Sequence, residues 1–156
     1  VWGFKKDADM AKVAAELEVP VILMHNRKEP NYQSLMDDVI ADLRESIDIA
    51  TKAGVDPSRI ILDPGIGFGK TYHHNLLVMN RLDEIVAMGY PVLLGTSRKS
   101  MIGLTLDLPV TERMEGTAAT IAMGIMKGVN IIRVHDVKEM KRVATMMDAM
   151  VYMKEQ

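Results

Sequence analysis

The chain has 156 residues, close to the size of one domain, and with 48% hydrophobic residues it can bury a substantial core. Its 19 Lys and Arg against 21 Asp and Glu give a formal net charge of -2, so the chain lacks the excess of positive charge that nonspecific nucleic-acid binding requires. The absence of cysteine excludes disulfides, thiolate metal sites and a cysteine nucleophile, and no apolar run approaches the about 20 residues of a membrane-spanning helix. We therefore expect neither nucleic acid nor a membrane as a partner.

In chain order, the sequence predicts a first helix and then four strands that alternate with helices. The four runs are short, β-branched and near-continuously apolar, which is typical of parallel strands covered by helices on both faces. This alternation indicates an α/β fold, either a doubly wound sheet or about half of a (β/α)8 barrel, which needs about 250 residues. The predicted buried strands are 19–24, 60–62, 91–94 and 130–134.

Glycines and capping residues mark the predicted helix boundaries. The longest predicted helix spans 32–53, and Gly54 stands at the position of a helix-terminating glycine. Two further helices are predicted to begin after N-caps at Thr111 and Asp136, the latter in a capping box with Glu139. The same stop signal occurs at Gly89 and Gly128.

Polar residues that follow the strands are the candidates for chemistry, because both architectures bind ligands at the carboxyl ends of their strands. Asp63 either receives a planar ligand edge with two N–H groups or caps its own loop. Arg133 and His135 share one face of the last strand and suit a phosphate or carboxylate. Alternatively, Arg133 pairs with Asp63 or Asp136.

A glycine-rich run after the second strand ends in Gly69-Lys70-Thr71, as a P-loop does. It lacks the P-loop spacing, because Pro64 stands where the first glycine is required and has no N–H for a phosphate. We expect instead a tight loop whose glycines let a ligand approach the backbone, with Phe68 as one wall of the pocket.

The residues after the third strand suggest a site for an anion. The run Gly-Thr-Ser at 95–97 fails as a nucleophile elbow because Lys99 occupies the place of the required glycine. Arg98, Lys99 and Ser100 stand at a predicted helix start, where N–H groups and the helix dipole favour an anion. A solvated basic turn is the alternative.

The histidines and methionines give weaker signals. No His-Glu-x-x-His pattern or other cluster of metal ligands is evident, so we predict no metal site in these residues. Most of the 14 methionines fall at helical core spacing, and Met24 is the exception because it follows a strand to the polar rim.

Taken together, the motifs resemble the dihydropteroate synthase family of pterin-binding enzymes over essentially the whole chain. Several long motifs in the same order are more specific than any single one. They are Val-Trp-Gly at 1–3, Leu-Met-His-Asn at 23–26, Ile-Leu-Asp-Pro-Gly-Ile-Gly-Phe-Gly-Lys-Thr at 61–71, Gly-Thr-Ser-Arg-Lys-Ser at 95–100, Glu-Arg-Met-Glu-Gly-Thr at 112–117 and Arg-Val-His-Asp-Val at 133–137.

This resemblance implies a (β/α)8 barrel, of which residues 1–156 would be a single partial domain with strands five to eight. It implies condensation of 6-hydroxymethyl-7,8-dihydropterin diphosphate with 4-aminobenzoate, in which diphosphate leaves and the arylamine captures the pterin cation. It also implies Mg²⁺ in the full-length enzyme, a homodimer and a cytoplasmic location. By position, the pterin would contact Asp63, Lys99, Met24, Phe68 and Gly95, the aminobenzoate Ser100, and the diphosphate Arg133 and His135, with Lys99, Arg133 and His135 as catalytic residues.

Two alternatives stay open, a pterin-binding methyltransferase-like barrel and a noncatalytic pterin-binding half-barrel. The family motifs that precede Val1 are absent and the chain starts without methionine, so we expect a fragment. Such a fragment is expected to lack turnover, and its open strand edges are expected to favour self-association.

Overall fold

The computed structural model describes residues 2–154 and contains four parallel strands. They are β1 (Val21–Met24), β2 (Ile60–Asp63), β3 (Leu93–Leu94) and β4 (Ile131–Ile132). Strand β1 pairs with β2 and β3 pairs with β4 as two two-stranded sheets, and an isolated bridge between Leu62 and Val92 places them in the order β1-β2-β3-β4. The predicted parallel α/β arrangement is therefore confirmed.

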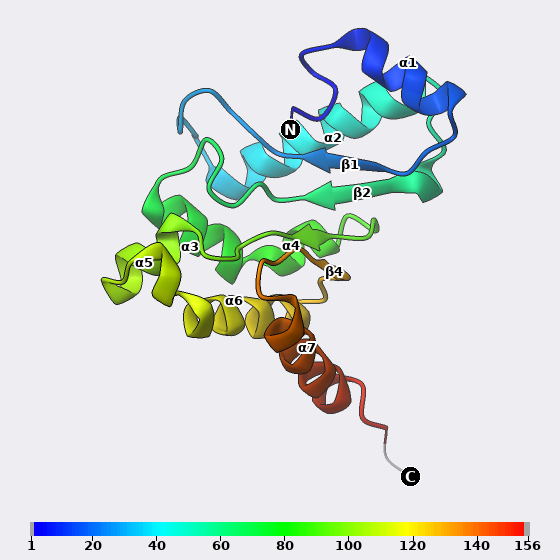
Figure 1. The fold of residues 1–156 in the computed structure, drawn as a ribbon. Coiled ribbons are helices and arrows are strands. Elements are labelled where there is room, and N and C mark those ends of the chain that lie inside the picture. The colour runs from blue at the N-terminus through cyan, green and yellow to red at the C-terminus, as the bar shows by residue number, and fades with distance from the viewer. Residues whose placement is uncertain (1, 155–156) are drawn as a thin grey trace.

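Helices connect all of the strands, as predicted, and two connections contain two helices each. The helices are α1 (Ala8–Glu16), α2 (Leu35–Lys52), α3 (Tyr72–Asn80), α4 (Leu82–Val86), α5 (Ser100–Leu106), α6 (Met114–Met126) and α7 (Val137–Val151), with 3-10 turns at Pro57–Arg59 and Val110–Glu112. The chain runs from α1 and α2 beside β1, at one end, to α6 and α7 beside β4 at the other (Figure 1). The polar rim is thus assembled from segments far apart in sequence.

Helix α2 shows why these residues fold as they do. Its buried face repeats at helical spacing through Met36, Val39 and Leu43, all of which are fully buried. It begins three residues later than predicted because Ser34 is extended, with φ −133°. It ends where predicted, since Gly54 adopts φ +99°, which favours glycine.

One predicted N-cap is wrong, and the other is confirmed in position only. Thr111 lies inside a 3-10 turn, and α6 begins only at Met114. Asp136 does precede α7, but its carboxylate makes no capping hydrogen bond and no capping box with Glu139, because it pairs with Arg98. The stops at Gly89 and Gly128 are confirmed by positive φ angles.

The prediction that every strand is buried on both faces is also wrong. On β1, Leu23 is 1% exposed whereas Ile22 is 50% exposed, and on β4 Ile131 is 37% exposed. The core lies between the strands and the helices, so alternate side chains of the outer strands are left open to solvent. We call this side of the strands, which carries Ile22 and Ile131, the uncovered face.

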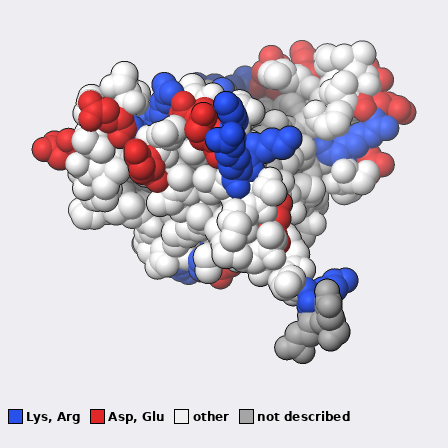
Figure 2. Space-filling model, turned by 60° about the horizontal axis from the view of Figure 1, so that its bottom comes forward, with Lys and Arg blue, Asp and Glu red and all other residues white. Residues whose placement is uncertain are grey.

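Charge is distributed without a dominant sign on the face of the molecule drawn in Figure 2, where Lys and Arg are interspersed with Asp and Glu. No helix of residues 2–154 is long and apolar enough to span a membrane.

Candidate functional site

The carboxyl ends of the four strands form a continuous polar rim. Met24 is paired in register with Asp63, and the His25 N–H donates to the Asp63 carbonyl at 2.9 Å. On the other pair, the Arg133 N–H donates to the Leu94 carbonyl at 2.9 Å. By alternation, Met24 and Asp63 share the uncovered face with Ile22.

Asp63 uses one carboxylate oxygen for its own loop. Its Oδ1 accepts the Gly65 N–H at 2.7 Å, so the loop-capping interpretation is confirmed for that oxygen. Among residues 2–154 no hydrogen-bond donor reaches Oδ2, which leaves it available to a ligand. Burial raises the pKa of Asp63, although the Gly65 hydrogen bond and the charges of Lys99 and Lys70 oppose that increase.

The glycine-rich run folds as a tight loop, as predicted. Gly65, Gly67 and Gly69 all have positive φ, and a Cβ on Gly65 would collide with the backbone of His25. Asn75 of α3 is buried and fastens the loop by accepting the Gly67 N–H at 2.7 Å. The loop is therefore held tightly against the end of β1.

Lys99 and Phe68 meet above this loop. The Lys99 ammonium donates to the Ile66 carbonyl and lies 4.7 Å from the centre of the Phe68 ring, a cation–π contact. Phe68 is 37% exposed, so its ring can also face a ligand. Burial lowers the pKa of Lys99, which the nearby Asp63 carboxylate opposes.

Arg133 and His135 line a pocket of about 110 Å³ together with Gly95, Ser97 and Lys99. The predicted shared face is confirmed, since Arg133 and His135 are both exposed and the residue between them is less so. Within residues 2–154 Arg133 forms no ion pair, so its predicted pairing with Asp63 or Asp136 is not observed.

Ser97 orients His135 and was not identified from the sequence. Its Oγ accepts the backbone N–H of His135 at 3.1 Å and lies 2.9 Å from the ring Nδ1. This contact holds the imidazole ring in place, and which of the two atoms donates depends on the tautomer of the ring. Ser97 is 6% exposed, a poor setting for a nucleophile.

The basic run after β3, residues 98–100, contains one residue in an ion pair and one exposed at the start of a helix. Arg98 forms a two-point ion pair with Asp136, at 3.0 and 2.5 Å, so its guanidinium is engaged. Ser100 is exposed at the first turn of α5, as predicted. The solvated-turn interpretation is therefore wrong for Arg98.

A second group that sequence analysis missed lies beneath the rim. The imidazole of His25 is fully buried and bridges the Asp42 carboxylate, 3.0 Å from Nε2, and the Lys70 ammonium, 2.7 Å from Nδ1. Burial is the main cause that lowers the pKa of His25 to about 3 and that of Lys70 to about 7. Burial is the largest single influence on Asp42 and opposes its ionisation, but the Arg27 hydrogen bond and the charges of Lys5 and Arg27 together outweigh it and lower the pKa of Asp42.

Metal ligands do not converge in the part of the chain that the structure describes. No group of three His, Asp or Glu side chains within residues 2–154 could hold an ion. The residues present therefore do not fit the Mg²⁺ that the resemblance implies.

Comparison with known proteins identifies the family to which the chain belongs. Residues 1–135 match the family of pterin-binding enzymes. The chain belongs to that family. The family match includes every rim residue from Met24 to His135.

Relatives that match nearly the whole of this chain include dihydropteroate synthases. Those of Bacillus subtilis and Clostridium beijerinckii are both 61% identical, over 96% and 97% of this chain, which covers 53% and 56% of theirs. The crystal structure of the Clostridium difficile enzyme in the presence of pteroic acid superposes with a TM-score of 0.94 at 46% identity, covering 96% of this chain and 57% of that one. The chain thus spans about half the length of the relatives it matches.

Proposed function

We propose that the chain supplies strands five to eight of a (β/α)8 dihydropteroate synthase and carries its pterin and diphosphate subsites. The observation that carries the proposal is the rim itself, on which Asp63, Lys99, Arg133 and His135 meet from three strands. A methyltransferase-like barrel needs a pterin carboxylate but no diphosphate site, so the Arg133 and His135 pair favours the synthase. The named relatives support the same choice.

Asp63 would recognise the pterin. Its available Oδ2 and its shared Oδ1 form a carboxylate edge that can accept two N–H groups of an aminopyrimidine. Lys99 would donate to the pterin ring, Phe68 and Met24 would flank its faces, and Gly95 would line the adjoining wall. A negative Asp63 also stabilises positive charge that develops on the pterin as its C–O bond breaks.

Arg133 and His135 would hold the leaving diphosphate. The guanidinium offers a fork of donors, and the His135 ring, oriented by Ser97, would donate an N–H. Both donors stabilise the negative charge that collects on the diphosphate oxygens. The amine nitrogen of 4-aminobenzoate then forms the new C–N bond and loses a proton, with its carboxylate near Ser100.

Other expectations from the family stay proposals. Any Mg²⁺ would be held outside residues 2–154, because these offer no ligand set. Sulfonamide sensitivity is proposed from the Yersinia pestis enzyme solved as a sulfonamide drug complex, which has a TM-score of 0.89 at 36% identity. A cytoplasmic location and a homodimer follow from the same relationship, and exposed apolar residues of the uncovered face such as Ile22 support self-association of the chain.

The test is calorimetric titration of the chain with pteroic acid, in wild type, Asp63→Asn and the exposed control Asp48→Asn. We expect saturable binding that weakens about 10- to 100-fold in Asp63→Asn, because a charge-assisted hydrogen bond is lost, and is unchanged in the control. Binding without product from the two substrates would support a pterin-binding half-barrel. Absence of binding by the folded wild type would overturn the proposal.

A further inference from the structure

Lys70 ends the glycine-rich loop and turns its side chain back beneath it. The ammonium donates to His25 Nδ1 at 2.7 Å, to the Gly65 carbonyl at 3.0 Å and to the Phe68 carbonyl at 3.2 Å. An ammonium group has three N–H donors and each has an acceptor here. Lys70 therefore joins both ends of the 65–68 turn to the end of β1.

His25 is oriented for this contact from its other side. Because its Nδ1 accepts from Lys70, the ring proton is on Nε2 and is donated to Asp42 of α2 at 3.0 Å. Asp42 is held in turn by Arg27 at 2.6 Å and by Lys5 at 3.5 Å. The ammonium is thus placed by a hydrogen-bond chain that begins on a long, well-packed helix.

The groups that Lys70 holds are those that would contact a pterin. The Gly65 carbonyl accepts from Lys70 while the N–H of the same residue donates to Asp63 Oδ1 at 2.7 Å. The Phe68 N–H donates to the Gly65 carbonyl at 3.0 Å, so the position of the aromatic ring depends on the same turn. Displacement of the ammonium would remove its hydrogen bonds to the Gly65 and Phe68 carbonyls, which tie this turn to His25.

We propose that Lys70 is a positioning residue of the pterin site, clamped by His25 and Asp42 so that the loop presents the pterin-binding side chains. The proposal rests on the proposed function. It assigns Lys70 no contact with the substrate and explains why a cation lies under a loop that lacks P-loop geometry. It predicts that loss of the ammonium loosens residues 64–70 and weakens pterin binding while the diphosphate subsite is unaffected.

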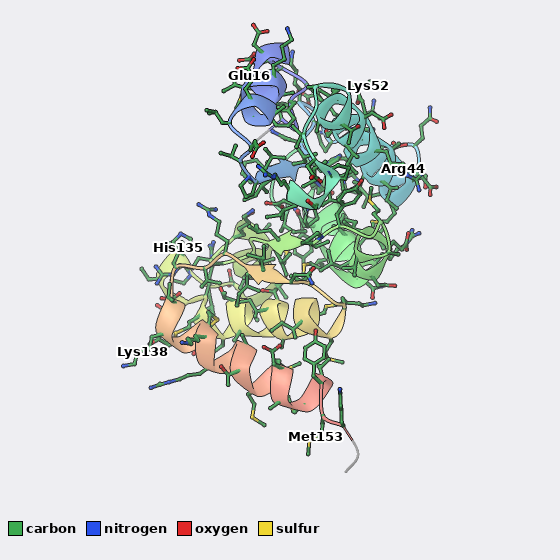
Figure 3. All side chains as sticks on the ribbon, turned by 90° about the vertical axis from the view of Figure 1, so that its right-hand side faces the viewer. Glu16, Arg44, Lys52, His135, Lys138 and Met153 are labelled. Atoms are coloured by element: carbon green, nitrogen blue, oxygen red, sulfur yellow. The ribbon has the colours of Figure 1, made fainter. Side chains whose placement is uncertain are left out.

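The first measurement is amide hydrogen exchange below pH 7, where Lys70 is protonated, and it needs no ligand. In Lys70→Met, exchange across 64–70 is expected to accelerate, with Lys70→Arg restoring protection because it keeps a cationic donor. The matched control is Lys52→Met on α2, where Lys52 is exposed and well separated from His135 (Figure 3). Unchanged exchange across 64–70 in Lys70→Met would overturn the proposal, whether or not pteroic acid binds.

The second measurement separates this proposal from the proposed function. We expect Lys70→Met to bind pteroic acid about 10- to 100-fold more weakly than wild type and inorganic pyrophosphate equally well. Equal pteroic acid affinity, or equal loss for both ligands, would overturn the positioning role. Failure of the wild type to bind pteroic acid would instead count against the proposed function alone, and the exchange measurement would still decide whether Lys70 clamps the loop.

A further variant covers the case in which Lys70→Met does not fold. His25→Leu keeps the ammonium and removes its imidazole acceptor, so faster exchange confined to the same loop is expected. Protection equal to wild type in that variant would show that His25 does not hold Lys70 in place and would overturn the proposal.

Discussion

The buried imidazole of His25 makes the stability of the chain depend on pH in a way that can be calculated. Its pKa is about 3 in the folded chain, against a usual value of 6.5. Because the folded-state pKa is the lower one, the stability contribution of this group is complete above pH 6.5 and is lost as the pH falls toward 3. At pH 5 the imidazole is protonated in the unfolded chain but not in the folded chain. Because pH 5 lies about 1.5 units below 6.5 and each unit is worth about 1.4 kcal/mol, the free energy of unfolding is lowered by about 2 kcal/mol.

Urea unfolding at pH 7 and pH 5, followed by circular dichroism, measures this cost. Between the two pH values, wild type is expected to lose about 2 kcal/mol more than His25→Gln, which has no titratable group at this position. His73→Gln, at an exposed position on α3, is the matched control and is expected to lose as much as wild type. Equal losses in wild type and His25→Gln would refute the assignment of a neutral, buried His25.

Two further predictions concern the rim. Ser97→Ala removes the hydroxyl that contacts the His135 ring and backbone, so affinity for inorganic pyrophosphate should fall about fivefold. Calorimetry that shows no loss would contradict a role for Ser97 in orienting His135. Gly65→Ala should destabilise the chain by at least about 2 kcal/mol more than Gly89→Ala, since both have positive φ but only the first would press a Cβ against the His25 backbone. Similar unfolding midpoints for the two alanine variants would show that the loop can move away.

Local patterns in the sequence were sufficient for much of the fold and rim. The strand positions followed from short apolar runs, and Gly54 marked the end of α2 because a positive φ at that place is a local requirement. Asp63 and Arg133 were found because each follows a strand, and parallel strands bring their carboxyl ends together. These inferences needed no knowledge of which helix packs where.

Local patterns could not predict which side chains pair when they lie far apart in the sequence. Asp42 lies 17 positions from His25, in the middle of a helix where an acidic residue is ordinarily a solvated one, and Lys70 lies 45 positions away. The capping box predicted for Asp136 and Glu139 fails for the same reason, because the Asp136 carboxylate pairs with Arg98, 38 positions earlier. One signal was present in the sequence, namely a lysine that closes a glycine-rich turn.

Strands β2 and β3 are joined by one isolated bridge, between Leu62 and Val92, whereas β1 pairs with β2, and β3 with β4, over consecutive residues. Asp63 therefore belongs to one strand pair and Arg133 follows the other. Side-chain contacts across this boundary, such as the hydrogen bond from Lys99 to the Ile66 carbonyl, supplement the sparse backbone pairing. The spacing between the two halves of the rim thus depends on side chains as much as on the sheet.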